Sequence, residues 1–182
     1  MEKRTNHHLP KNVLISASQI ASRVKELASE ISEDLEKINL IALVVMQGSF
    51  IFAADLLRAL SSKLDLTVDF IFIQSYGAST SPSEEIAIVK DVQFPIHDKD
   101  ILVIEDIVDT GATINFLRKR LLSQGARSIH TVTLLEKMLK APPLESLDYV
   151  GFRIPDVFVV GYGLDLAQRY RALPDIRVVD RN

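Results

Sequence analysis

Apolar residues recur along the chain with two different spacings, and segments of the two kinds alternate. Steps of three and four residues predict an amphipathic helix over residues 16–38, and further helical patterns cover residues 50–60 and 114–124. Short apolar or alternating runs predict strands at residues 41–46, 66–73, 86–90, 101–104 and 129–135. Gly125 stands just past the third helix, where it would serve as a cap.

Alternation of strand and helix is typical of a parallel sheet with helices on both faces, so we expect an α/β fold. The 182 residues are enough for one well-cored domain, which we expect to span residues 1–182. After Pro142-Pro143 the pattern changes to short strand-like pieces, which predict a small lobe formed mainly by about residues 1–20 and 141–182. A polar stretch of small residues at 74–85 is expected to form a mobile loop.

Composition narrows the possible functions. The net charge of −3 gives no basic footprint for nucleic-acid binding. The absence of cysteine excludes disulfides, thiolate catalysis and cysteine-ligated zinc, and it fits a reducing compartment. No apolar run approaches the ~18 residues of a membrane helix, and the first ten residues lack the apolar core of a signal peptide. We therefore expect a cytoplasmic protein that binds neither nucleic acid nor a membrane.

The stretch over residues 101–114 carries the most distinctive chemistry of the chain. An apolar strand is followed by three carboxylates within five residues, those of Glu105, Asp106 and Asp109. A short loop then leads into a helix, and it consists of Thr110, Gly111, Ala112 and Thr113. Unpaired amides and hydroxyls at a helix start suit a phosphate monoester. In the alternative interpretation, Asp109 or Thr110 only caps the helix.

Glu105 and Asp106 favour a ligand site over a plain helix cap. Adjacent acids at the end of a buried strand are costly unless something pairs with them. The neighbouring hydroxyls of a sugar, or a magnesium shell, would satisfy both, so the stretch predicts a ribose 5-phosphate site. The competing interpretation is a solvated strand end with incidental charge. Asp-Thr-Gly also occurs in aspartic proteases, but there it lies in β-rich surroundings, whereas here it opens a helix.

The run over residues 104–113 resembles the phosphoribosyl pyrophosphate signature of type I phosphoribosyltransferases. Among them the chain is similar to the hypoxanthine (hypoxanthine-guanine) phosphoribosyltransferases. The resemblance extends over most of the chain, through residues 48–58 (first loop and helix), 75–77 (start of a catalytic lid), and 134–137 with 158–165 (base binding). It implies that family's fold, in which helices flank a central parallel sheet and the chain termini form a small hood lobe.

The resemblance implies Mg²⁺-dependent transfer of a phosphoribosyl group from phosphoribosyl pyrophosphate to hypoxanthine or guanine, in purine salvage. The products would be a purine nucleoside monophosphate and pyrophosphate, and the protein would be a homodimer or homotetramer. Glu105 and Asp106 would hold the ribose hydroxyls and stabilise positive charge on the sugar. Asp109 would act as the acid/base group, and the segment from Asp109 to Thr113 would bind the phosphate.

Roles in base and pyrophosphate binding are implied in the same way. Lys137 would bond the 6-oxo group, Phe158 would stack on the purine, and the backbone of Val159 would meet the base edge. Without the resemblance, Lys137 is an ordinary solvated lysine and Phe158 an ordinary core residue. The metal ligands would be Glu105, Asp106 and Asp165, the last also beside the purine. Pyrophosphate would contact Gln47, Gly48, Ser49 and Arg171, with Arg169 as a competitor, and the lid would contain Ser75 and Tyr76.

Two positions depart from the family pattern. Gln47 stands where relatives usually have Lys or Arg, and Ala112 stands where some have Lys. The family also has a cis peptide bond before the glycine of the first loop, which is a possibility for Gly48. Three alternatives remain: a phosphoribosyltransferase for xanthine, adenine or orotate, a nucleotide-sensing regulator on the same fold that binds RNA, and a plain phosphate-binding module.

Overall fold

The computed structural model describes residues 9–36, 39–60, 64–76, 85–139 and 147–179. Its main sheet has six strands in the order β4-β3-β2-β5-β6-β7. Their bounds are β2 Leu40–Met46, β3 Leu66–Tyr76, β4 Glu85–Lys90, β5 Asp100–Val108, β6 Ser128–Lys137 and β7 Tyr149–Ile154. Neighbouring strands are parallel except β3 and β4, which are antiparallel. The expected α/β fold with a central parallel sheet is therefore confirmed.

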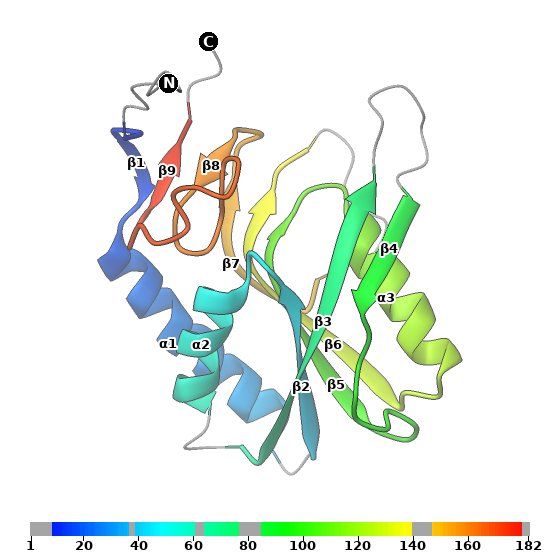
Figure 1. Ribbon diagram of the computed structural model, residues 1–182. Coiled ribbons are helices and arrows are strands. Elements are labelled where there is room, and N and C mark those ends of the chain that lie inside the picture. The colour runs from blue at the N-terminus through cyan, green and yellow to red at the C-terminus, as the bar shows by residue number, and fades with distance from the viewer. Residues whose placement is uncertain (1–8, 37–38, 61–63, 77–84, 140–146, 180–182) are drawn as a thin grey trace.

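Three helices cover the two faces of this sheet (Figure 1). Helices α1 (Ala17–Asp34) and α2 (Phe50–Leu60) pack together on one face, and α3 (Ala112–Ser123) lies on the other. The buried hydrophobic residues form one cluster on each face of the sheet. One cluster includes Phe52 of α2, and the other includes Leu117 of α3. Both helical faces thus bury apolar side chains against the sheet, as the spacing predicted.

A second, three-stranded antiparallel sheet brings distant parts of the chain together beside the main sheet (Figure 1). It consists of β1 (Asn12–Ile15), β9 (Ile176–Val178) and β8 (Val159–Val160), in the order β1-β9-β8. These segments lie in the ranges expected for the small lobe. Strand β7 also lies in that range, but it pairs with β6 and belongs to the main sheet.

Several predicted boundaries needed correction. Strand β5 continues through Glu105 and Asp106 to Val108, because β6 lies alongside as far as the pair Val108–Glu136 and keeps the ladder intact. Strand β3 likewise continues through residues 74–76, the start of the expected mobile loop, because β4 pairs with it there. Residues 77–84 lie outside the described residues. Helix α1 ends at Asp34, whereas the pattern predicted residue 38.

Other local predictions are confirmed. Helix α2 has the predicted bounds, and α1 starts after Ser16, whose hydroxyl accepts from the Gln19 amide at 3.3 Å. The Gln19 side chain accepts in return from the Ser16 amide at 2.9 Å, which completes a capping box. Gly125 follows α3 with φ +86°, the left-handed conformation that ends many helices, so its role as a cap is also confirmed.

The turn after β4 is held by the carboxylate of Asp69, which is buried in β3. It accepts backbone hydrogen bonds from Phe70 (2.8 Å), Gln93 (2.6 Å) and Phe94 (3.1 Å). Burial alone would raise the pKa of Asp69, but the hydrogen bonds from Phe94, Gln93 and Phe70 outweigh it and lower the pKa below its usual value.

We predict that Asp69→Asn lowers the free energy of unfolding by about 2 kcal/mol at pH 7, since a buried charged acceptor is weakened. Because the pKa is depressed in the folded protein, this stability is present above the unfolded value near pH 4 and is lost as the pH falls further. Denaturant unfolding from pH 7 to pH 3 measures both effects. The control is Asp65→Asn at an exposed position, and equal stabilities of the two variants would contradict the assignment.

Candidate active site

The parallel strands of the main sheet end along one edge (Figure 1), and several predicted site residues belong to the segments at these strand ends. Gln47 and Gly48 follow β2, and Glu105 and Asp106 lie near the end of β5. Lys137 is the last residue of β6, the next strand along the sheet. Ligands of open α/β sheets bind at this edge, because the connecting loops gather there.

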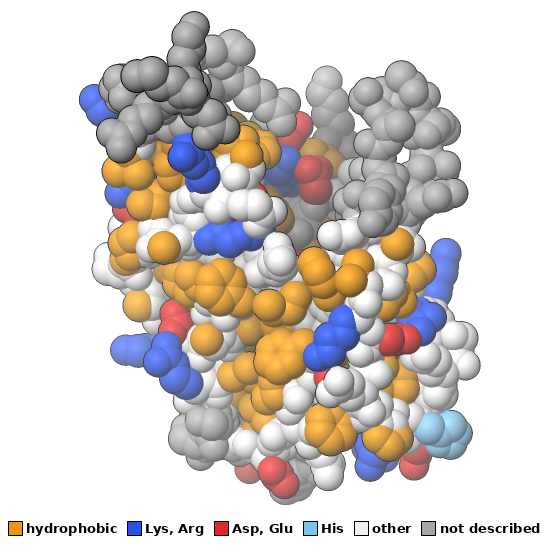
Figure 2. All heavy atoms as spheres, viewed as in Figure 1, with side chains coloured by type: hydrophobic (Ala, Val, Ile, Leu, Met, Phe, Trp, Pro, Cys, Tyr) orange, Lys and Arg blue, Asp and Glu red, His pale blue; other side chains and the backbone are white. Residues whose placement is uncertain are grey.

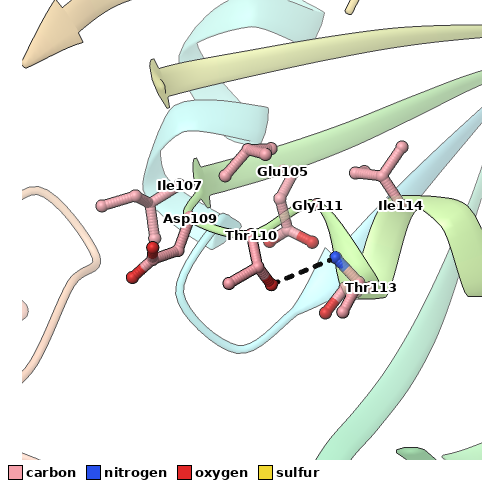
Figure 3. Close-up of a pocket in the computed structure, with 9 residues that line it drawn as sticks. Glu105, Ile107, Asp109, Thr110, Gly111, Thr113 and Ile114 are labelled. Atoms are coloured by element: carbon pink, nitrogen blue, oxygen red, sulfur yellow. Dashed lines mark hydrogen bonds between the residues drawn. The ribbon is translucent and has the colours of Figure 1, made fainter. Parts of the chain in front are cut away.

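A small cavity of about 160 Å³ lies over the loop between β5 and α3 (Figure 3). Its lining includes Glu105, Thr110, Gly111 and Thr113. Gly111 is the N-cap of α3, with φ +81°, and as a glycine it makes no side-chain cap hydrogen bond. The N-cap position is therefore neither Asp109 nor Thr110, and the Thr110 hydroxyl reaches only the first amide of the helix, that of Ala112, at 3.4 Å. Because the N-cap residue has no side chain, donors of the first turn remain available to an anion.

The Thr110 side chain turns toward the start of α3 (Figure 3). Its hydroxyl accepts from the Ala112 amide at 3.4 Å, a long contact that an anion can replace. Ala112 itself lines the cavity with its small side chain. The loop thus has the short side chains and the left-handed glycine that close approach of a phosphate requires.

Glu105 and Asp106 line two different cavities. Successive side chains of a strand point to opposite faces, so Glu105 opens to the loop cavity and Asp106 to a second cavity of about 520 Å³. Burial first, and then the negative charge of Asp106, raise the pKa of Glu105 well above its usual value. Burial also raises the pKa of Asp106. The protein therefore maintains two carboxyl groups that are costly to ionise in the absence of a partner.

We predict that Glu105→Gln raises the melting temperature at pH 8 by roughly 2–4 °C, because it removes a buried charge. The folded-state pKa of Glu105 is raised, so its destabilising effect is present at high pH and disappears as the pH falls through that pKa. The gain should therefore vanish by about pH 4. Thermal melts at both pH values test this, with the exposed Glu33→Gln as control. A lower melting temperature at pH 8 would show that the charge is compensated.

The second cavity depends on two close backbone contacts. A Cβ on Gly48 would lie 1.6 Å from Asp106 Oδ2, and a Cβ on Gly163 would lie 2.0 Å from the Gly48 carbonyl oxygen. Gly163 also has φ +105°, which side chains rarely adopt. The peptide between Met46 and Gln47 is cis, one bond earlier than the peptide directly before Gly48. Only glycine fits at both positions. The segment after β2, the segment that contains Gly163 and strand β5 therefore pack closely against one another there.

Arg171 faces this cavity and is held by several acceptors. Its guanidinium donates to the Gly163 carbonyl at 2.7 Å and to Gln168 Oε1 at 3.0 Å, and it lies 2.9 Å from Asp165 Oδ1. It also approaches Gln47 Oε1 at 3.4 Å. The competing residue, Arg169, is exposed, does not line the cavity, and exchanges backbone hydrogen bonds with Leu166.

Lys137 is not the solvated lysine of the alternative interpretation, since its side chain is only 11% exposed. Its Nζ lies 2.7 Å from Asp109 Oδ2 and 3.1 Å from Asp156 Oδ1. Burial alone would lower the pKa of Lys137, but the hydrogen bonds to Asp109 and Asp156 raise it above its usual value. Phe158 is half-buried just before β8, and Val159 is buried within β8.

The remaining predicted residues are Ser49, Ser75 and Tyr76. Ser49 is fully buried and its hydroxyl donates to the Val45 carbonyl, so its side chain supports the start of α2 and does not face the cavity. Ser75 and Tyr76 end β3, and their side chains lie outside what the structure describes. The sequence did not single out Asp156, Gly163 or Gln168. A signal for Gly163 was its second position in Gly-Tyr-Gly, where a tight turn is expected.

Two further features are absent from the described residues, 9–36, 39–60, 64–76, 85–139 and 147–179. Among these residues, no three or more His, Asp or Glu side chains gather closely enough to hold a metal by themselves. Within the same ranges, no helix is long and apolar enough to cross a membrane.

Comparison with known proteins identifies the family. The model of the phosphoribosyl transferase domain matches residues 15–167. A hypoxanthine-guanine phosphoribosyltransferase from Bacillus subtilis (strain 168) is 42% identical over 172 residues, which cover 94% of each chain. The chain belongs to the hypoxanthine-guanine phosphoribosyltransferases. A member of this family from Dictyostelium discoideum is 39% identical over 168 residues, covering 91% of this chain and 93% of that protein.

Solved structures of hypoxanthine-guanine phosphoribosyltransferases and their relatives agree with the observed fold. A hypoxanthine phosphoribosyltransferase from Staphylococcus aureus has a TM-score of 0.89 and 36% identity, covering 98% of this chain and 97% of that chain. An enzyme of the same family from Bacillus anthracis, with a HEPES molecule in its active site, has a TM-score of 0.88 and 41% identity. It covers 94% of this chain and 100% of that one. The resemblance inferred from the sequence is therefore confirmed.

Proposed function

We propose that this protein transfers the 5-phosphoribosyl group of phosphoribosyl pyrophosphate to hypoxanthine and guanine, releasing pyrophosphate, as a step of purine salvage. The observation that carries the proposal is the Lys137–Asp109 pair beside the α3 loop cavity. A donor for a 6-oxo group, a carboxylate for a ring proton and an anion site for a 5′-phosphate lie at one edge of the sheet. The family supports the same reaction.

The reaction breaks the bond between C1′ of the ribose and the pyrophosphate oxygen, and it forms a bond from C1′ to a purine nitrogen. Positive charge develops on the ribose as pyrophosphate leaves. Glu105 and Asp106 place negative potential near this charge, and their carboxylates would accept hydrogen bonds from the ribose hydroxyls. A cationic sugar is then the partner that offsets the cost of ionising two buried carboxyl groups.

Asp109 would receive the proton that the purine loses from its five-membered ring. Its carboxylate is half exposed, lines the loop cavity and lies 2.7 Å from Lys137 Nζ, so a base seated against Lys137 would lie beside it. The same residue holds the Lys137 ammonium at 2.7 Å in the free protein, so base binding must share or displace this contact. Phe158 and the backbone of Val159 would flank the purine.

Lys137 would select the base, because its ammonium donates hydrogen bonds and cannot accept them. A 6-oxo group offers an acceptor, whereas the 6-amino group of adenine offers donors. Adenine would therefore leave a largely buried ammonium without its partner, and a site of this kind can discriminate strongly.

The residues of the second cavity fit Mg²⁺ together with pyrophosphate. Asp106 and Asp165 supply two carboxylates, and this ion commonly binds through one or two carboxylates while phosphate oxygens and water complete its shell. When bound, it would neutralise charge on the departing pyrophosphate. Arg171 and the backbone at Gln47 and Gly48 would bind the same group. Glu105 lines the other cavity, so a ligand role for it would require a bridging arrangement.

We further propose that the protein is a cytoplasmic homodimer or homotetramer. Hydrophobic side chains gather across the middle of the face shown in Figure 2. Large hydrophobic residues that stay more than two-fifths exposed include Phe50 on α2 and Phe70 on β3. A contiguous exposed apolar surface is typical of a protein–protein interface.

One assay tests the proposed reaction. The protein is mixed with phosphoribosyl pyrophosphate, Mg²⁺ and hypoxanthine, guanine, xanthine or adenine, and the ultraviolet change is followed. We expect turnover with hypoxanthine and guanine and little with adenine. Turnover with xanthine alone would assign another substrate, and no turnover with any of the four bases would contradict an enzymatic function.

We predict that Asp109→Asn lowers kcat at least 100-fold with hypoxanthine, because general acid–base catalysis typically contributes 10²–10⁴-fold. The variant should fold normally, since half of the Asp109 side chain is exposed. Steady-state kinetics and thermal melts measure both properties. A turnover number equal to that of the wild type would remove Asp109 from its role.

We predict that Lys137→Met reduces discrimination between hypoxanthine and adenine at least tenfold, because about 1.4 kcal/mol corresponds to a factor of ten and a charged hydrogen bond contributes about that much or more. The ratio of kcat/KM for the two bases is the measurement. Met keeps the length of the side chain and removes its charge. An unchanged ratio would assign base selection to other residues.

A further inference from the structure

Asp156 is a carboxylate of the site to which neither the sequence pattern nor the proposed reaction assigns a role. It lies between β7 and β8, two residues after Ile154, which pairs with Lys137 across the sheet. The Val157 amide donates to the Pro155 carbonyl at 2.8 Å, so Asp156 is the central residue of a tight three-residue turn. This turn brings Asp156 Oδ1 to 3.1 Å from Lys137 Nζ.

Lys137 is thus anchored by carboxylates from two separate segments. Asp109 comes from the loop after β5, and Asp156 comes from the segment after β7. A lysine side chain has four flexible carbons and many rotamers, so a single contact leaves its ammonium free to move. Two contacts restrict the ammonium to one position, and this position is where the proposed base would present its oxygen.

The charges of Asp109 and Asp156 change differently during the proposed reaction. Asp109 accepts the proton of the purine, and its attraction for the ammonium falls as its charge is neutralised. Asp156 takes no proton in the proposed reaction and keeps its charge throughout. Because the segment over residues 155–159 also carries Phe158 and Val159, movement of the base-stacking residues and of the lysine anchor is linked through one short stretch of chain.

We propose that Asp156 is a positioning residue, which holds the Lys137 ammonium at the purine's 6-oxo group while Asp109 exchanges a proton with the base. The inference rests on the proposed function. It predicts that the free enzyme shares Lys137 between two acids, and that a bound 6-oxopurine replaces Asp109, and not Asp156, as a partner of the ammonium.

The test is Asp156→Asn, which keeps the shape of the side chain and removes its charge. We expect KM for hypoxanthine to rise about tenfold, which is the effect of losing one charge-assisted hydrogen bond. KM for phosphoribosyl pyrophosphate should not change. Preference for hypoxanthine over adenine should fall by a similar factor, because an unanchored Lys137 turns toward Asp109. Asp156→Glu restores the charge and should recover most of the preference.

A matched control is Asp98→Asn at the opposite edge of the sheet. Asp98 is exposed to a similar extent, 72% against 65% for Asp156, and its substitution makes the same change of charge. Asp98 has φ +56°, a conformation that asparagine also tolerates. This variant should keep wild-type constants for both substrates, which separates a local effect from a general change of surface charge.

A double-variant cycle decides whether Asp156 acts through Lys137. In a Lys137→Met background, Asp156→Asn should cause no further loss of selectivity. An equal loss in both backgrounds would overturn the proposal, and so would an equal rise in KM for both substrates. If Asp156→Asn does not fold, Asp156→Ala in both backgrounds answers the same question, because it also removes the carboxylate and should lower selectivity only where Lys137 is present; the side chain is 65% exposed, so its truncation leaves no buried cavity.

Failure of the inference can be told apart from failure of the proposed function. Wild-type protein that does not convert hypoxanthine or guanine contradicts the function itself. Active wild type, together with an Asp156→Asn variant that matches Asp98→Asn in every constant, contradicts only the role of Asp156.

Discussion

Two adjacent carboxyl groups lie near the end of a central strand, that of Glu105 buried and that of Asp106 partly buried, and the rest of the site is arranged around them. Their pKa values are raised because burial disfavours the charged forms. The strand sends one of them to each of two cavities, and in the proposed reaction these cavities would receive the 5′-phosphate and the pyrophosphate. Under the proposed function, a sugar cation between these groups would compensate both charges, and the site would then bind the transition state more tightly than the substrate.

The backbone contacts follow from this arrangement. Asp106 leaves no space for a side chain at position 48, and the Gly48 carbonyl leaves none at position 163. Arg171 then closes the cavity by bonding the Gly163 carbonyl and pairing with Asp165. Gln47, in place of the cation usual in the family, lies beside Arg171 and accepts a long hydrogen bond from it. A second cation at this position would repel Arg171, so the neutral amide is compatible with an arginine held this close.

Local patterns predicted the helices and the alternation of helices with strands, because these depend on residue spacing. They also predicted the loop that begins α3, because Gly111 marks it. They did not predict that β5 continues through Glu105 and Asp106, since the apolar run stops there while the ladder with β6 continues. They could not show that Asp156 reaches Lys137, because a contact across 19 residues of sequence depends on how β6 and β7 pair. The division of the two acids between cavities was also hidden, since adjacency in sequence suggested one shared ligand.

A crystal structure with inosine monophosphate tests the account most directly. It predicts the 5′-phosphate on the amides over residues 110–113, ribose hydroxyls against Glu105 or Asp106, and the 6-oxo group at Lys137. In that complex Lys137 Nζ should still lie within hydrogen-bonding distance of Asp156. A nucleotide bound elsewhere on the protein, with the α3 loop vacant, would contradict the central claim.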